Sequence, residues 1–130
     1  MLMKEFVKRH GITMTTESWH ENPNFDGSEQ MHHYRCELTK DGSRMKLFYS
    51  MGLGLKGRPT VEDVLECLAL DAVSYDNTAD FEDWANELGY SDDSIKACRT
   101  YKAVKRQTEA LKKFLGEAYY TLRWEIEEDE

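Results

Sequence analysis

Positive charge is absent from the middle of this chain. Residues 59–95 contain eleven Asp and Glu residues and no Lys or Arg. The whole chain of 130 residues holds 17 Lys and Arg against 25 Asp and Glu, which gives a net charge of −8. An acidic protein stays soluble and is repelled by phosphate backbones unless its charges are segregated. This balance argues against nucleic-acid or anionic-membrane binding by the molecule as a whole.

Cysteines and long apolar runs are also scarce. The three cysteines, Cys36, Cys67 and Cys98, are odd in number and form no CxxC motif. This spacing argues against a disulfide framework or a zinc knuckle, and we expect buried thiols in a cytosolic protein. No apolar run approaches the roughly 18 residues of a membrane helix. The N-terminal residues are too few and too charged for a signal peptide.

The sequence contains few residues that indicate catalysis. His20 comes close to His32 or His33 across the strands, with Cys36 on the same face as His32, only if the strand register allows it. We therefore expect ordinary strand histidines and no metal site. The Gly-rich stretch at residues 52–57 lacks the Lys-Ser/Thr pair of a phosphate-binding loop. No Ser or Cys lies in a nucleophile motif. We therefore expect no enzymatic activity and no cofactor.

Alternating polar and apolar residues predict three strands. The first covers residues 12–20, with Ile12, Met14 and Thr16 on one side. Residues 31–39 and 44–52 alternate in the same way around a turn at Asp41-Gly42, where glycine accepts a positive φ. The predicted core-facing residues of these two strands are His32, Tyr34, Cys36, Leu38, Met45, Leu47, Tyr49 and Met51.

Apolar residues spaced three and four apart predict helices in the second half. The first covers about residues 61–75, with Thr60 and Asp63 as a capping box. A short helix follows a cap at Asn77 or Thr78 and ends at Gly89. Its predicted buried face is Phe81, Trp84, Ala85 and Leu88.

The longest helix is expected to begin after a cap at Ser91 and to reach Gly116. Its predicted core stripe is Ile95, Ala97, Cys98, Tyr101, Val104, Thr108, Leu111, Phe114 and Leu115. Residues 117–124 fit either a continued helix or a packed tail. The final acidic residues are expected to fray.

Together these elements predict an α+β fold. A three-stranded antiparallel sheet packs against a helical C-terminal half of three main helices, and a short N-terminal helix ends at Gly11. We expect one domain over residues 1–130. Residues 1–58 form the short helix and the sheet, 59–120 form the helical part, and 121–130 form an acidic tail.

Charge is segregated along the chain. Residues 96–113 hold seven Lys and Arg against Glu109, directly after the acidic middle. One interpretation is that the acidic and basic helices neutralise each other within the fold. The other is that part of the acid forms a docking surface for a basic groove on a partner, because complementary charge selects partners and speeds association. The proposed contact residues are Asp76, Asp80, Glu82, Asp83, Glu87, Asp92 and Asp93.

The basic helix offers an alternative function. Lys96, Arg99, Lys102, Arg106 and Lys113 fall on one side of the predicted helix, where they can contact phosphates. Aromatic residues for base stacking are missing from that side, so direct nucleic-acid binding ranks below protein binding.

Four stretches of the sequence carry a resemblance. They are "ENPNFDG", "MHHYRCELTKDGSRMKLFYSMGLG", "PTVEDVLECLALDA" and "DFEDWANELGYSDDSIKACRTYKA". Together they resemble a family of small acidic proteins encoded by tailed bacteriophages and prophages, over residues 1–120. The pattern Phe81–Trp84–Gly89–Tyr90 is the most distinctive part. The resemblance assigns no catalytic residue.

The resemblance implies a setting for the function. Small acidic phage proteins often bind and disable host defence or regulatory proteins, as anti-CRISPR and anti-restriction proteins do. We therefore expect an accessory protein in the host bacterial cytoplasm that inhibits a nucleic-acid-handling complex, in the manner of a DNA mimic. A homodimer is an alternative state for the free protein.

Overall fold

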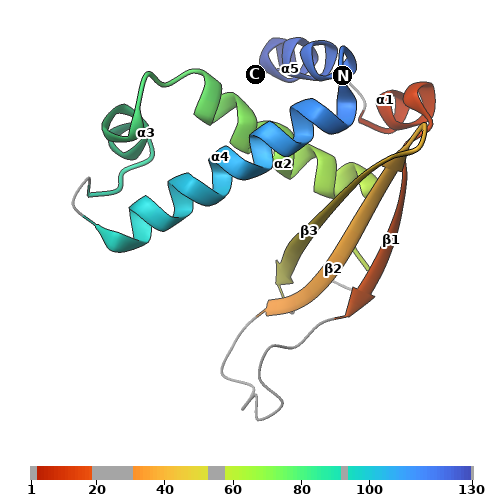
Figure 1. The fold of residues 1–130 in the computed structure, drawn as a ribbon, viewed down its shortest axis with the longest axis horizontal. Helices are drawn as coiled ribbons and strands as arrows, with labels where there is room; N and C mark the ends of the chain where they lie inside the picture. Colours follow the sequence, from red (N-terminus) through yellow and green to blue (C-terminus); the bar gives the residue numbers. More distant parts are fainter. Residues whose placement is uncertain (1–2, 19–30, 53–57, 92–93, 130) are drawn as a thin grey trace.

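The computed structural model describes residues 3–18, 31–52, 58–91 and 94–129 of the chain. The elements in chain order are α1 (Met3–His10), β1 (Thr13–Ser18), β2 (Met31–Lys40), β3 (Ser43–Gly52), α2 (Val61–Asp76), α3 (Phe81–Glu87), α4 (Ile95–Leu115) and α5 (Ala118–Asp129). Figure 1 shows the sheet extending downward from one end of the helical part, while α4 extends sideways toward α3. The predicted α+β fold is confirmed.

The three strands form one antiparallel sheet in the order β1-β2-β3. Cys36 at the centre of β2 lies opposite Thr16 of β1 and Leu47 of β3. The hairpin between β2 and β3 turns through Asp41 and Gly42, which have φ angles of 48° and 84°. Two successive positive φ angles are typical of the type I′ turn, which suits the twist of paired strands.

One face of this sheet covers the main core. Tyr34, Cys36 and Leu38 of β2 and Met45 of β3 are buried there, in the alternation that the sequence predicted. The main core also contains buried residues of α1, α2, α4 and α5. The other face of the sheet carries the intervening side chains, which are mostly exposed on β1 and β3.

A second, smaller cluster holds α3 against α4. Trp84, Ala85 and Val104 are buried in it. Tyr75, Phe81, Tyr90 and Tyr101 pack around them, and we call this set with its three buried members the aromatic cluster. The Trp84 ring lies 5.5 Å from that of Tyr90 and 5.3 Å from that of Tyr101, measured between centroids. Trp84 is therefore a core residue, as predicted.

Several helix ends differ from the prediction. The capping box of Thr60 and Asp63 is confirmed, but the cap of α3 is Asp80 and the cap of α4 is Ser94. Gly116, with a φ of 60°, ends α4. A further helix, α5, then runs to Asp129, so the segment predicted as an acidic tail is helical through that residue.

Three residues that were predicted to be buried, Leu88, Ile95 and Cys67, lie at the surface. Ile95 is 72 % exposed because it begins α4 on the side away from the core, and Leu88 is 46 % exposed because α3 ends just before it. Cys36 is buried as predicted, whereas Cys67 is exposed on the outer side of α2 and Cys98 is half-buried.

Candidate interaction surfaces

Asp76, the last residue of α2, lies at the centre of a partly buried polar network. Its carboxylate is 3.1 Å from the Lys112 ammonium of α4 and 3.3 Å from the Arg123 guanidinium of α5. The Tyr119 hydroxyl donates to the same carboxylate. Burial, and then this hydrogen bond, raises the pKa of Tyr119, so the hydroxyl remains a donor at neutral pH. Asp76 therefore joins three helices, and we leave it out of the proposed contact surface.

Asp80 and Asp83 cap the short helix α3. The Asp80 carboxylate accepts from the backbone N–H of Asp83 at 2.9 Å, and the Asp83 carboxylate accepts from the backbone N–H of Ala79 at 2.9 Å. Negative charge at a helix N-terminus also complements the helix dipole. Both side chains are exposed, so their remaining oxygen atoms face solvent while they hold the helix start in place.

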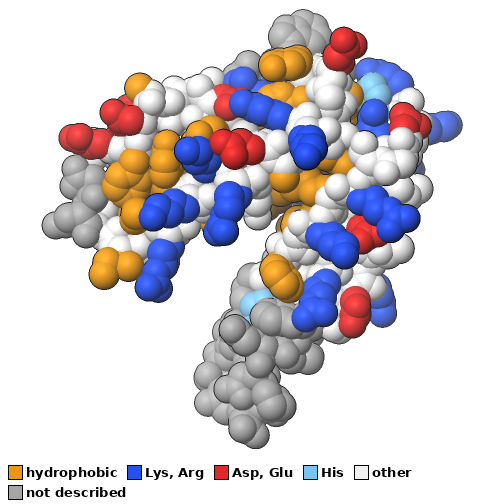
Figure 2. Space-filling view, viewed as in Figure 1, with side chains coloured by type: hydrophobic (Ala, Val, Ile, Leu, Met, Phe, Trp, Pro, Cys, Tyr) orange, Lys and Arg blue, Asp and Glu red, His pale blue; other side chains and the backbone are white. Residues whose placement is uncertain are grey.

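Glu82 and Glu87 are exposed on α3. Among the described residues, no cation lies within ion-pair distance of either carboxylate. Figure 2 shows acidic side chains at the left of the molecule, over α3. Asp92 and Asp93, the other two predicted contact residues, lie outside the described residues.

A shallow hollow of about 400 Å³ separates α3 from α2. Its lining includes Leu70 and Val73 of α2 and the carboxylates of Asp83 and Glu87. Leu70 is 42 % exposed, and Glu66 lies one helical turn before it, also exposed. We call Glu66, Asp80, Glu82, Asp83 and Glu87 the acidic surface. The apolar spot at Leu70 was missed from sequence because it interrupts the outer, polar side of α2.

The basic residues of α4 lie apart from the acidic surface. Lys96, Arg99, Lys102, Arg106 and Lys113 are all exposed. No described carboxylate pairs with any of them. Mutual neutralisation of the two helices is therefore limited, in the part of the chain that the structure describes, to the contact between Lys112 and Asp76.

Lys and Arg side chains gather on one face of the molecule, along α4 and over the sheet (Figure 2). The C-terminal end of α4 lies against β3, and the two elements form a concave corner. A hollow of about 360 Å³ lies there, lined by Arg44, Lys46, Ala110 and Lys113 among others. The exposed residues of the sheet therefore continue the basic side of α4.

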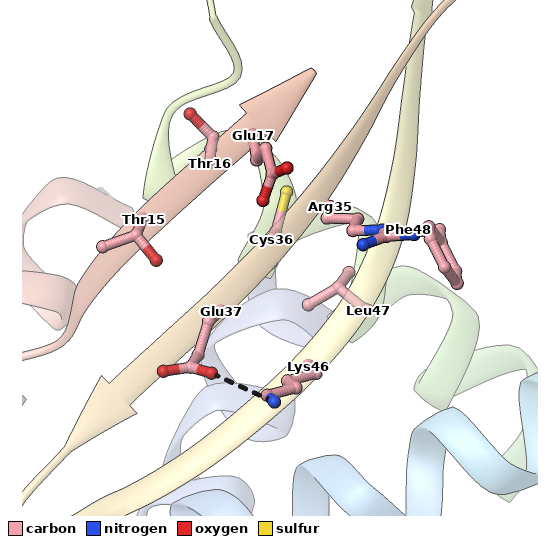
Figure 3. A pocket seen from close by; sticks show the side chains of 9 residues that line it. All are labelled: Thr15, Thr16, Glu17, Arg35, Cys36, Glu37, Lys46, Leu47 and Phe48. Carbon is pink, nitrogen blue, oxygen red and sulfur yellow. Dashed lines mark ion pairs between the residues drawn. The ribbon is translucent and has the colours of Figure 1, made fainter. Parts of the chain in front are cut away.

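The open face of the sheet holds a wider hollow of about 670 Å³ (Figure 3). Lys46 pairs with Glu37 at 3.8 Å, and Arg35 lies over the Phe48 ring with its guanidinium carbon 6.0 Å from the ring centre. Phe48 is 60 % exposed. None of the predicted contact residues lies on these strands. The same alternation assigns Arg35, Lys46 and Phe48 to the outward side.

Neither Cys36 nor Cys67 has the lowered thiol pKa of an activated nucleophile. Cys67 is exposed as a residue, but partial burial of its thiol, followed by the charges of Asp71 and Glu66, raises the pKa of Cys67. Burial also raises the pKa of Cys36. Because the thiolate is the nucleophile, a thiol with a raised pKa is poorly reactive at neutral pH.

The described ranges contain no group of three His, Cys, Asp or Glu side chains placed to hold a metal ion. His20, one of the predicted strand histidines, lies outside them. Nor does any helix in these ranges combine the length and apolar character that crossing a membrane requires.

Comparisons of the chain with protein-family models, curated proteins and solved structures find no match.

Proposed function

We propose that this protein acts by binding another protein through its acidic surface. The observation that carries the proposal is the separation of charge in the fold. The exposed carboxylates of Glu66, Asp80, Glu82, Asp83 and Glu87 have no cationic partner among the described residues. The basic side of α4 is exposed separately and does not cover them.

The hollow between α2 and α3 suggests the chemistry of the contact. Leu70 and Val73 offer apolar walls, and Asp83 and Glu87 offer carboxylates. A lysine or arginine side chain matches this combination, because its methylene stem packs on apolar surface while its charged end meets a carboxylate. We therefore propose a partner that presents Lys or Arg side chains on a basic groove.

The resemblance to phage proteins, carried by segments such as residues 80–103, supports a partner class. A host complex that handles nucleic acid has a basic groove of the required kind. The acidic surface would compete there with the nucleic acid, as an inhibitor of the anti-CRISPR or anti-restriction type does. This assignment rests on the resemblance and on charge complementarity.

The test is a quantitative capture experiment with the variant Glu82→Lys/Glu87→Lys. This variant keeps Asp80 and Asp83, whose reversal would damage the start of α3. Nuclease-treated bacterial lysate is passed over the wild-type protein and the variant, and each captured protein is purified for direct titration. We expect the dissociation constant to rise by at least about tenfold in the variant.

The matched control is Glu5→Lys/Glu117→Lys. It makes the same change in net charge at exposed positions on α1 and in the turn between α4 and α5. We expect it to bind as the wild type does. Equal affinity of the partner for the wild type and for Glu82→Lys/Glu87→Lys would contradict the proposal.

A further inference from the structure

A second surface of opposite charge lies across α4 and the open face of the sheet. Its cations are Arg35, Arg44, Lys46, Arg99, Lys102, Arg106 and Lys113, and all of them are exposed. Three carboxylates, those of Glu17, Glu37 and Glu109, lie on the same elements and faces. We call this set of seven cations the cationic surface. It has an excess of positive charge in a molecule whose net charge is −8.

The cationic surface is continuous between its two elements. Lys113 of α4 lines the corner hollow together with Arg44 and Lys46 of β3. Lys46 also lines the wider hollow on the sheet, where Arg35 and Phe48 lie. The path from Arg99 to Lys113 is about 21 Å along the helix axis. The path from Arg44 to Phe48 adds about 13 Å along the strand.

Phe48 supplies a feature that the basic side of α4 lacks. Phe48 is 60 % exposed at the end of this path, on the edge strand β3 of the open face of the sheet. Arg35, its neighbour on β2, lies over the ring. An exposed aromatic ring between cations is a platform on which a nucleobase can stack while its phosphates meet the cations.

We propose that the cationic surface binds single-stranded nucleic acid. The phosphates contact Arg99, Arg106 and Lys113 along α4 and then Lys46 at the corner hollow. A base stacks on Phe48. A single strand is favoured over a duplex because stacking on Phe48 needs an unpaired base face. The cationic surface shares no residue with the acidic surface, so the two proposals are tested with different variants.

Fluorescence anisotropy of a labelled single strand of about 15 nucleotides tests the proposal, since known sites of this kind span about 4–16 nucleotides. We expect binding at low salt that weakens as salt rises, with a slope of about −0.7 for each phosphate contact. The variant Arg106→Gln/Lys113→Gln should reduce this slope by about 1.4. The matched control Lys4→Gln/Lys8→Gln, at exposed positions on α1, should leave it unchanged.

Phe48 is tested separately from the charges. We expect Phe48→Ala to weaken binding by about tenfold without changing the salt slope, and Phe48→Trp to retain it, because stacking is independent of charge. Both variants replace an exposed side chain, so the fold is kept. Three results would overturn the proposal: no salt-dependent binding by the wild type, unchanged affinity in Phe48→Ala, or duplex DNA bound as tightly as the single strand.

Discussion

At the scale of single residues, Asp76 links distant parts of the chain. Its side chain is 14 % exposed and faces Lys112, Tyr119 and Arg123. An acidic residue at the C-terminal end of a helix is unfavourable for the helix dipole, so these donors offset an intrinsic cost. Removing one member of such a group leaves its partners without compensation.

We therefore expect Asp76→Asn to lower the free energy of unfolding by about 2 kcal/mol, below the range for fully buried pairs because the site is partly exposed. Urea denaturation measures the change. Tyr119→Phe should lower the free energy of unfolding less, by about 1 kcal/mol. The loss in the double variant should be smaller than the sum of the two single losses. Because the folded pKa of Tyr119 is raised, its contribution is fully present below the unfolded pKa of about 10 and is lost progressively as the pH rises from there through the folded pKa.

The comparison for this prediction is Glu109→Gln, an exposed residue on the outer side of α4. Its unfolding free energy should stay within about 0.5 kcal/mol of the wild type. An Asp76→Asn variant as stable as Glu109→Gln would show that the network contributes nothing to the fold.

At the scale of elements, local sequence predicts that a helix is present better than it predicts the residue at which the helix begins. Thr60 is predicted correctly because its capping box directly precedes a strong apolar stripe. Before α3, the side chains of Asp76, Asn77, Thr78 and Asp80 are all of types that cap helices. Packing of Trp84 into the aromatic cluster selects Asp80, and that packing depends on α4, which is distant in sequence.

The cap of α3 gives a prediction for this element. We expect Asp80→Ala to lower the free energy of unfolding by about 1 kcal/mol, because the Asp83 backbone N–H loses its acceptor. Asp80→Asn should lower the free energy of unfolding by only roughly a few tenths of 1 kcal/mol, because an amide oxygen can accept the same hydrogen bond. Equal losses in the two variants would mean that the carboxylate charge matters and the hydrogen bond does not.

At the scale of the whole molecule, contacts between residues that are distant in the sequence decide the features that the sequence alone does not predict. The acidic middle and the basic helix are visible in the sequence. The core-facing side of α4 was predicted, but whether the two charged segments cover each other depends on where α2 and α3 pack around α4, which contacts distant in sequence decide. The buried side of α4 is set by Val104, Thr108 and Leu111, which leaves Arg99 and Arg106 facing solvent. The alternation of the strands was predicted, but the meeting of β3 with Lys113 was not.

The two hydrophobic clusters differ in size, which predicts unequal local stability. The aromatic cluster buries only Trp84, Ala85 and Val104, whereas the main core draws buried residues from α1, the sheet, α2, α4 and α5. Regions with few buried contacts open at lower free energy than the whole fold. Native-state hydrogen exchange should therefore show α3 opening while α2 stays protected.

Two substitutions test this difference in stability. Trp84→Phe should lower the opening free energy of the α3 amides by about 1–2 kcal/mol and leave the central amides of α2 unchanged, because the loss is confined to the aromatic cluster. Leu68→Ala, in the main core, should lower the free energy of global unfolding by about 2–5 kcal/mol and so reduce the protection of α2. Equal loss of protection in α2 and α3 after Trp84→Phe would show that the two clusters unfold as one unit. In that case the acidic surface would be as rigid as the core, and a partner would meet a preformed α3.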